Sequence, residues 1–139
     1  MTPEEALALL DGQFGDINVR IFAVKKLSLL EDSQIALIMP QLVQALKYEL
    51  FHLSPLSEFL LEKALENTRV VGHAFFWALK ANLHQAHCRE RFYLILERFL
   101  MCCGQFKDDL FKQCLVDNSL IRLSNFVNEQ IDVHKKPLE

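Results

Sequence analysis

The stretch from Thr68 to Leu79 constrains the fold of this chain more than any other part of the sequence. It reads Thr-Arg-Val-Val-Gly-His-Ala-Phe-Phe-Trp-Ala-Leu, so that apolar residues point in almost every direction around a helix. A helix on the surface of a small protein carries apolar residues along one stripe only. This helix must therefore be covered from several sides, and we expect Trp77 to lie in the central core.

Glycine and proline residues fall where helices are expected to begin and end. Thr2-Pro3-Glu4-Glu5 is a capping box followed by proline at the first helical position, and Ser54-Pro55 repeats the same start signal. Gly104 is expected to end a helix. The side chains expected to open further helices are Asp16, Asp32 and Thr68.

Apolar residues recur at helical spacing between these signals. The stripes are Val19, Phe22, Ala23, Leu27 and Leu30; Cys88, Phe92, Ile95, Phe99 and Cys103; and Val116, Leu120, Leu123, Val127 and Ile131. Arg20, Lys25 and Lys26 lie mostly off the first stripe. No segment alternates with a period of two over enough residues to predict a strand, so the sequence predicts an all-α fold.

The expected helices come in pairs that begin about 40 residues apart, which is the spacing of HEAT-type repeats. We therefore expect a short α-solenoid of antiparallel helix pairs, a HEAT/armadillo-like superhelix in which each pair covers its neighbour. With 139 residues and 51% hydrophobic residues, the chain suits one domain over residues 1–133. Residues 134–139 have nothing to bury and are expected to form a frayed tail.

Composition excludes several classes of function. The formal net charge is -3, and no basic stretch is dense enough for nucleic-acid binding. Charged residues or His interrupt every apolar run before about 18 residues, so we expect no direct membrane insertion. The acidic first residues lack an apolar secretory segment, and we expect a cytoplasmic protein whose cysteines are reduced.

Some residues have spacings that resemble catalytic or metal-binding patterns. A continuous helix would place His84, His87 and Cys88 on one face, where Cys102 or Cys114 could complete a zinc site. The better interpretation is that Cys88 starts the core stripe and the histidines lie at a polar helix junction. The stretch Gly12-Gln-Phe-Gly15 lacks the spacing of a phosphate-binding loop. We predict no catalytic residue, no cofactor and no metal. His73 is interpreted as a core histidine beside Gly72, where another helix can approach closely.

The three rings of Phe75, Phe76 and Trp77 point in different directions, because successive helical residues turn by about 100°. One neighbouring helix cannot bury all three rings. Either the helix is central, or one ring faces a partner domain. Together with Phe99, whose turn is also rich in apolar residues, Phe75 and Phe76 form the candidate domain-docking face.

Three motifs resemble the helical accessory (PIK) domain of phosphatidylinositol 3-kinases. They are Asp16-Ile-Asn-Val-Arg-Ile-Phe-Ala-Val, Pro40-Gln-Leu-Val-Gln-Ala-Leu-Lys-Tyr-Glu49, and Arg69-Val-Val-Gly-His-Ala-Phe-Phe-Trp77, in the order and spacing of that family from Asp11 to about Gly104. The stretch Arg91–Gly104 is similar to the class I pattern. The family usually has proline where this chain has Leu50, so the following turn is expected to differ.

The resemblance implies a non-catalytic scaffold of a phosphatidylinositol 3-kinase, the enzyme that transfers phosphate from ATP to the inositol 3-hydroxyl. Its expected partners are the kinase domain and other domains of the same polypeptide, with a regulatory subunit as a further partner, and the parent enzyme is expected to be recruited to membranes. No residue here is assigned to the regulatory subunit. The alternative is a free-standing HEAT/armadillo-like adaptor, which should carry a ladder of exposed side chains repeating once per helix pair. The irregular positions of Asn18, Asn67 and Asn118 do not supply one.

Overall fold

The computed structural model describes residues 2–135, and within them the chain contains helices, turns and loops but no strand. The all-α fold class is confirmed. The chain divides into two compact units, Met1–Gly104 and Gln105–Glu139. The single domain over residues 1–133 stays a prediction, because the structure describes these units separately. Of the expected tail, residues 134 and 135 continue a helix, and 136–139 lie outside the described residues.

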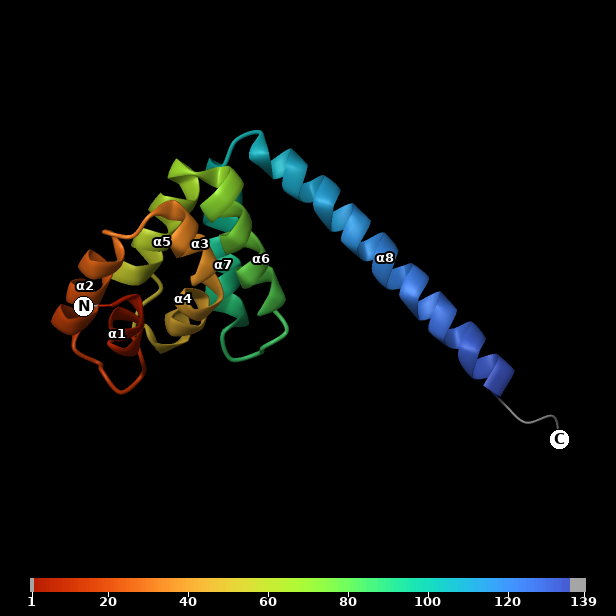
Figure 1. Ribbon diagram of the computed structural model, residues 1–139, viewed down its shortest axis with the longest axis horizontal. Coiled ribbons are helices and arrows are strands. Elements are labelled where there is room, and N and C mark those ends of the chain that lie inside the picture. Colours follow the sequence, from red (N-terminus) through yellow and green to blue (C-terminus); the bar gives the residue numbers. More distant parts are fainter. Residues whose placement is uncertain (1, 136–139) are drawn as a thin grey trace. The chain divides into compact units, whose positions relative to one another are not determined.

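The first unit contains seven α-helices in its described part, joined by short loops and two irregular turns (Figure 1). In chain order the elements are α1 (Pro3–Ala8), α2 (Ile17–Leu27), α3 (Asp32–Leu37), α4 (Met39–Ala45), the 3₁₀ turn η1 (Leu46–Tyr48), α5 (Pro55–Glu66), the π-helical turn η2 (Thr68–Gly72), α6 (His73–Ala81) and α7 (Arg89–Cys102).

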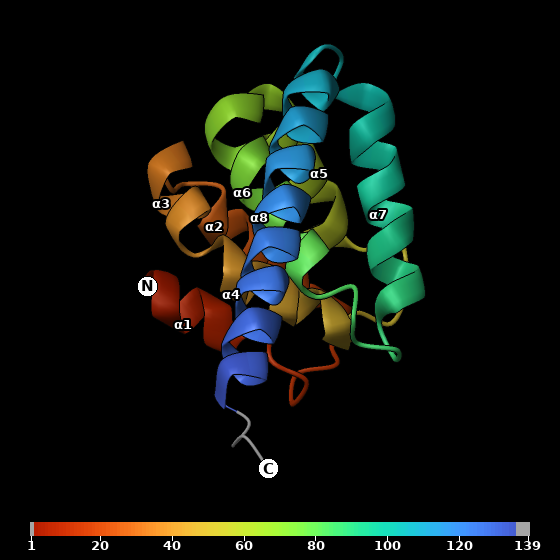
Figure 2. The same cartoon turned by 90° about the vertical axis from the view of Figure 1, so that its right-hand side faces the viewer.

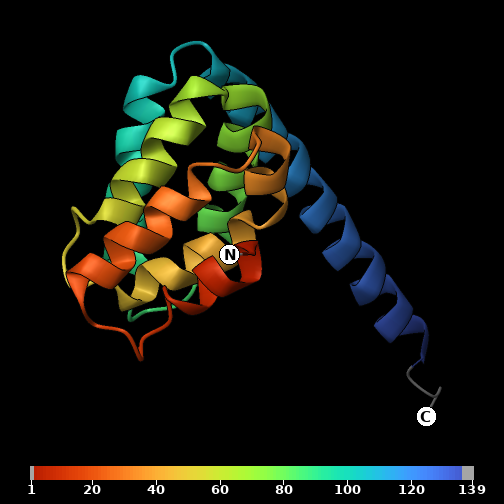
Figure 3. The same cartoon turned by 60° about the vertical axis from the view of Figure 1, so that its left-hand side comes forward.

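The longer helices of this unit form two rows. Helices α2, α5 and α7 lie side by side, with α5 in the middle (Figure 3), and Figure 2 shows α7 beside α5 from another side. Helix α4 packs on α6 in the second row, and α6 also contacts α5 and α7. This arrangement contains packed helix pairs, as expected. The superhelical form of a solenoid stays a prediction.

The core lies between the two rows. Its largest fully buried side chains include three phenylalanines, Phe75, Phe92 and Phe99, and leucines from α2, α4, α5 and α6. Each such side chain contributes about 1.5–3 kcal/mol when it is removed from water, so the packing of the rows supplies most of the stability of this unit.

Most of the expected helix starts are confirmed by their hydrogen bonds. The Thr2 hydroxyl accepts from the Glu5 N–H at 3.3 Å, and the Glu5 carboxylate accepts from the Thr2 N–H at 2.8 Å. The Asp16 carboxylate accepts from the Asn18 N–H at 2.7 Å, and Ser54 caps α5. Each of these side chains satisfies an N–H group that the first helical turn leaves without a backbone partner.

The start of the apolar helix differs from the expectation. Asn67, not Thr68, supplies the cap, with its side-chain oxygen accepting from the Val70 N–H at 3.3 Å. The next turn is wider than an α-helical turn, because the Gly72 N–H donates to the Asn67 carbonyl at 2.9 Å over five residues. The helical region therefore begins one residue earlier than expected, with η2 starting at Thr68 and α6 following at His73.

The second unit consists, in its described part, of helix α8 (Phe106–Lys135). Its 30 residues span about 45 Å at 1.5 Å per residue. The predicted stripe is exposed at 43 to 60%: its residues are Val116, Leu120, Leu123, Val127 and Ile131. Neither α8 nor any other described helix combines the length and the apolar character that crossing a lipid bilayer requires.

Candidate functional site

The three rings assigned to a docking face lie in the core instead. Phe75 and Phe99 are 0% exposed and Phe76 is 5% exposed, so none of them presents a ring to a partner. Phe75 meets Phe99 edge to face, with ring centroids 5.6 Å apart. The reason is the central place of α6: α4, α5 and α7 all pack on it and together cover the rings that one neighbouring helix could not.

The close packing around these rings depends on Gly72. A Cβ atom added there would lie 2.7 Å from the Ala64 carbonyl oxygen of α5 and 3.1 Å from the Phe99 ring of α7. The close approach predicted at this glycine is therefore confirmed. His73, by contrast, is exposed, so its interpretation as a core histidine is wrong.

Trp77 is only partly buried, which differs from its expected place in the central core. Its ring contacts Phe76 edge to face, with the centroids 5.3 Å apart. The Lys80 ammonium lies 5.0 Å from the centroid of the Trp77 ring. Phe75 and Phe76 take the inward positions on this turn, and the 100° step per residue then carries Trp77 toward the edge of the core.

The sequence patterns did not reveal a buried ion pair between Arg20 and Glu49. Arg20, which lies off the apolar stripe of α2, is nevertheless only 4% exposed, and Glu49 is 5% exposed. The Arg20 Nε–H donates to Glu49 Oε1 at 2.7 Å, and the Arg20 Nη2 atom lies 2.5 Å from the same oxygen. A buried ion pair is stable only when its geometry is good and further hydrogen bonds satisfy its remaining polar atoms.

Arg20 also binds the backbone of three other positions. Its Nη1–H groups donate to the carbonyl oxygens of Asp11 at 3.4 Å and Phe14 at 3.2 Å, and its Nη2–H donates to that of Ala45 at 3.4 Å. The planar guanidinium thus joins the α1–α2 loop, the end of α4 and the start of the loop before α5. Among the described residues, every buried side-chain nitrogen or oxygen has a hydrogen-bond partner.

Apolar side chains near Arg20 are exposed in the loop before α5 and at the first residue of α2. Leu50 is 72% exposed, Phe51 66%, Leu53 58% and Ile17 51%. They line a hollow of about 240 Å³ beside the ion pair. Large exposed apolar groups that gather in one place are typical of surfaces that contact another protein. The accessible candidate surface of this unit is therefore at these residues, not on the rings of α6 and α7.

The residues considered for a zinc site make other contacts. The His84 Nδ1 atom lies 2.8 Å from the Ala81 carbonyl oxygen, and the Cys88 thiol donates to the Gln85 carbonyl at 3.6 Å. Among the described residues, no three His, Cys, Asp or Glu side chains lie together so that they could hold a metal ion. Cys88, which directly precedes α7, is buried, as its place at the start of the apolar stripe predicts.

Comparison with known proteins identifies relatives over nearly the whole chain. Residues 1–112 match the model of the phosphoinositide 3-kinase family accessory domain (PIK domain). Phosphatidylinositol 3-kinase 1 of Dictyostelium discoideum is 43% identical over 136 residues, or 98% of this chain and 9% of that protein. Phosphatidylinositol 3-kinase 2 of the same organism is 42% identical over 120 residues, or 86% of this chain and 6% of the relative.

A human relative is also similar. Phosphatidylinositol 4-phosphate 3-kinase C2 domain-containing subunit beta is 40% identical over 130 residues, or 93% of this chain and 8% of that protein. The chain thus spans less than a tenth of the length of each of these three relatives. The class I character of residues 91–104 stays a prediction. From the family match and these identities, the chain belongs to the phosphoinositide 3-kinase accessory-domain (PIK domain) family.

Proposed function

We propose that this chain is the non-catalytic scaffold domain of a phosphatidylinositol 3-kinase. In this role it holds the lipid-kinase domain and its regulatory contacts, and the parent enzyme transfers phosphate from ATP to the inositol 3-hydroxyl. The observation that carries the proposal is the family match over residues 1–112, with relatives named as phosphatidylinositol 3-kinases at 42 and 43% identity. The partners are the kinase domain and other domains of the parent, with a regulatory subunit as a further one.

The chemistry of the described residues supports a mechanical role. A scaffold must keep its shape while other domains pull on it. The first unit has a buried aromatic core and a buried ion pair in which Arg20 donates to Glu49 and to three backbone carbonyl groups. The exposed loop side chains Leu50, Phe51 and Leu53 then offer a surface for another domain of the parent. The same role places the parent enzyme in the cytoplasm, from which it is recruited to membranes that carry its lipid substrate.

A domain exchange tests this proposal. The 136 matching residues of phosphatidylinositol 3-kinase 1 are replaced by this chain, and lipid-kinase activity is measured on phosphatidylinositol vesicles. We expect the chimera to retain a substantial part of the parent activity. The control replaces the same residues with an unrelated helical domain of similar length and should be inactive.

The isolated chain provides a second measurement. It should show no lipid-kinase turnover above a heat-denatured sample, and it should bind the relative's kinase domain in sedimentation experiments. A chimera that folds but is as inactive as the unrelated replacement would contradict the scaffold role, and so would a chain that phosphorylates lipid by itself.

A further inference from the structure

A groove runs along the first unit between α5 and α7, on the side where these two helices pack together. Its deeper end is a hollow of about 230 Å³ with an apolar floor made of Leu53, Leu61, Leu94 and Ile95. Leu53 is 58% exposed and Leu94 is 41% exposed, so part of this floor is open to solvent. The same Leu53 also lines the hollow beside the Arg20–Glu49 pair, which makes the two apolar surfaces continuous.

The groove continues along α5 as a shallower hollow of about 540 Å³, where Leu61 and Leu65 form the apolar part. Helix α5 has 12 residues and is about 18 Å long at 1.5 Å per residue. The groove therefore offers an apolar strip of roughly three helical turns. Two packed helices that leave such a strip open can accept a third helix along it.

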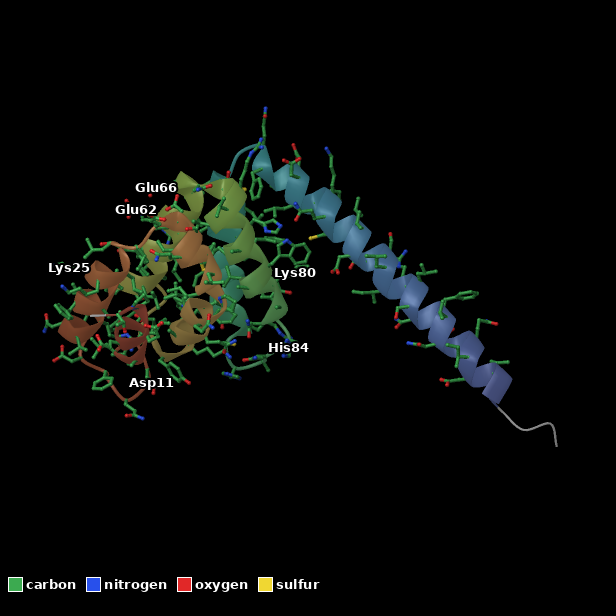
Figure 4. All side chains as sticks on the ribbon, viewed as in Figure 1. Asp11, Lys25, Glu62, Glu66, Lys80 and His84 are labelled. Atoms are coloured by element: carbon green, nitrogen blue, oxygen red, sulfur yellow. The ribbon has the colours of Figure 1, made fainter. Side chains whose placement is uncertain are left out.

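Carboxylates border this strip. Glu58, Glu62 and Glu66 follow one another at four-residue spacing on α5, and Glu97 adds a further carboxylate from α7. Figure 4 shows Glu62 and Glu66 close together on this helix. Arg98 is the one Lys or Arg side chain among the described residues that line the two hollows. Charges of one sign four residues apart on a helix repel one another, so this row disfavours the free helix unless a cation lies nearby.

The neighbouring Lys63 interacts with this row of carboxylates. Its ammonium donates to the Glu66 carboxylate at 2.9 Å. That hydrogen bond raises the pKa of Lys63, and the charges of Glu66, Asp32 and Glu62 act in the same direction. Within the described part of the chain, Glu58, Glu62 and Glu97 have no such partner. The border of the groove is therefore acidic and is only partly neutralised by Lys63 and Arg98.

We propose that the groove between α5 and α7 binds an amphipathic helix of a partner protein that carries Lys or Arg beside a stripe of large apolar residues. The apolar stripe covers Leu53, Leu61 and Leu94. The cations of the partner, spaced three or four residues apart, meet Glu58 and Glu62, since side chains at this spacing share one face of a helix. This partner is additional to the kinase domain of the scaffold proposal.

The test uses the complete 139-residue chain and two fluorescent probes. The first is a 16-residue helical peptide with leucine on one face and lysine on the other, and the second has glutamate in place of every lysine. Fluorescence anisotropy measures both affinities at low and at high salt. We expect the lysine probe to bind at least about tenfold more tightly than the glutamate probe, with a difference that shrinks as salt rises.

Matched variants locate the binding. Glu62→Lys and Leu94→Ser should each weaken the lysine probe by about tenfold, equivalent to ~1.4 kcal/mol. The controls are Glu90→Lys, which makes the same charge change at an exposed residue outside the groove, and Leu29→Ser, which alters a leucine that is 78% exposed. Both controls should leave the affinity unchanged. Circular dichroism and thermal melting confirm that all four variants are folded.

Three results would overturn the proposal. The probes could bind equally well, or the glutamate probe could bind better through Arg98. The groove variants could match their controls, which would place binding elsewhere. Sedimentation could also show that the chain dimerises and that Leu94→Ser abolishes the dimer, in which case the occupant of the groove is a second copy of this chain.

Discussion

Replacing Arg20 with leucine tests the most consequential contact in the structure. The change removes the partner of Glu49, which is 5% exposed, and leaves the carbonyl oxygens of Asp11, Phe14 and Ala45 without a donor that reaches all of them. Breaking a buried ion pair by removing one partner costs about 3–5 kcal/mol. A whole domain is stable by only about 5–15 kcal/mol, so the variant should be close to unfolding.

The expected fall in melting temperature follows from the size of the domain. For a unit of about 100 residues, 1 kcal/mol shifts Tm by roughly 4 °C or more, so Arg20→Leu should lower Tm by roughly 12–20 °C. Differential scanning calorimetry measures this directly, together with urea unfolding. The matched control is Lys25→Leu in the same helix, because Lys25 is exposed and its replacement should change stability by less than about 0.5 kcal/mol.

A double variant separates the energy of the pair from the cost of an unpaired charge. Arg20→Leu combined with Glu49→Leu removes both charges, and apolar replacement of a buried pair is often neutral or even stabilising. The double variant should therefore recover much of the stability that the single variant loses. If Arg20→Leu melts within about 2 °C of the parent, the buried ion pair does not stabilise these loops, and the expected loss of stability is wrong.

The remaining predictions concern the packing around α6. Gly72→Ala should lower stability by about 1–3 kcal/mol, because the new Cβ would meet the Ala64 carbonyl oxygen; Gly15→Ala, where nothing lies within 4 Å, is the control in urea unfolding. Phe75→Ala should cost about 3–5 kcal/mol in the same assay, since its ring is 0% exposed. Trp77→Ala should cost distinctly less than Phe75→Ala because the Trp77 ring is only partly buried, and equal costs in thermal melts would contradict this.

Local signals predicted the helices well because each rests on groups close together in the sequence. The capping box of Thr2 and the cap at Asp16 need only residues two or three positions apart, and both are confirmed. Gly104 ends α7 with a φ of 61°, a conformation that glycine adopts without strain. The all-α fold follows from such signals together with the helical spacing of apolar residues.

The site could not be predicted in the same way, because it depends on contacts between distant segments. Arg20 pairs with Glu49, which is 29 residues away, and the spacing of apolar residues within one helix gives no sign of such a pair. The sequence predicts a docking face at Phe75 and Phe76 because the order of residues does not show how many helices surround α6. The shift of the helix cap from Thr68 to Asn67 depends on the wide turn η2, for which the chain carries no known short signal.

The wide turn before α6 has a consequence for how chains of this family can change in length. Removing one residue elsewhere in a helix rotates every later side chain by about 100°, which would turn Phe75 out of the core. In η2 the Gly72 N–H donates to the carbonyl oxygen of Asn67, five residues earlier. The turn that this hydrogen bond closes is one residue longer than an α-helical turn. Deletion of the exposed Val70 would shorten this turn to an α-helical one, and the side chains of α6 would still point in the same directions. Alignment gaps of a single residue should therefore be tolerated at η2, whereas the same gap inside α6 should be selected against.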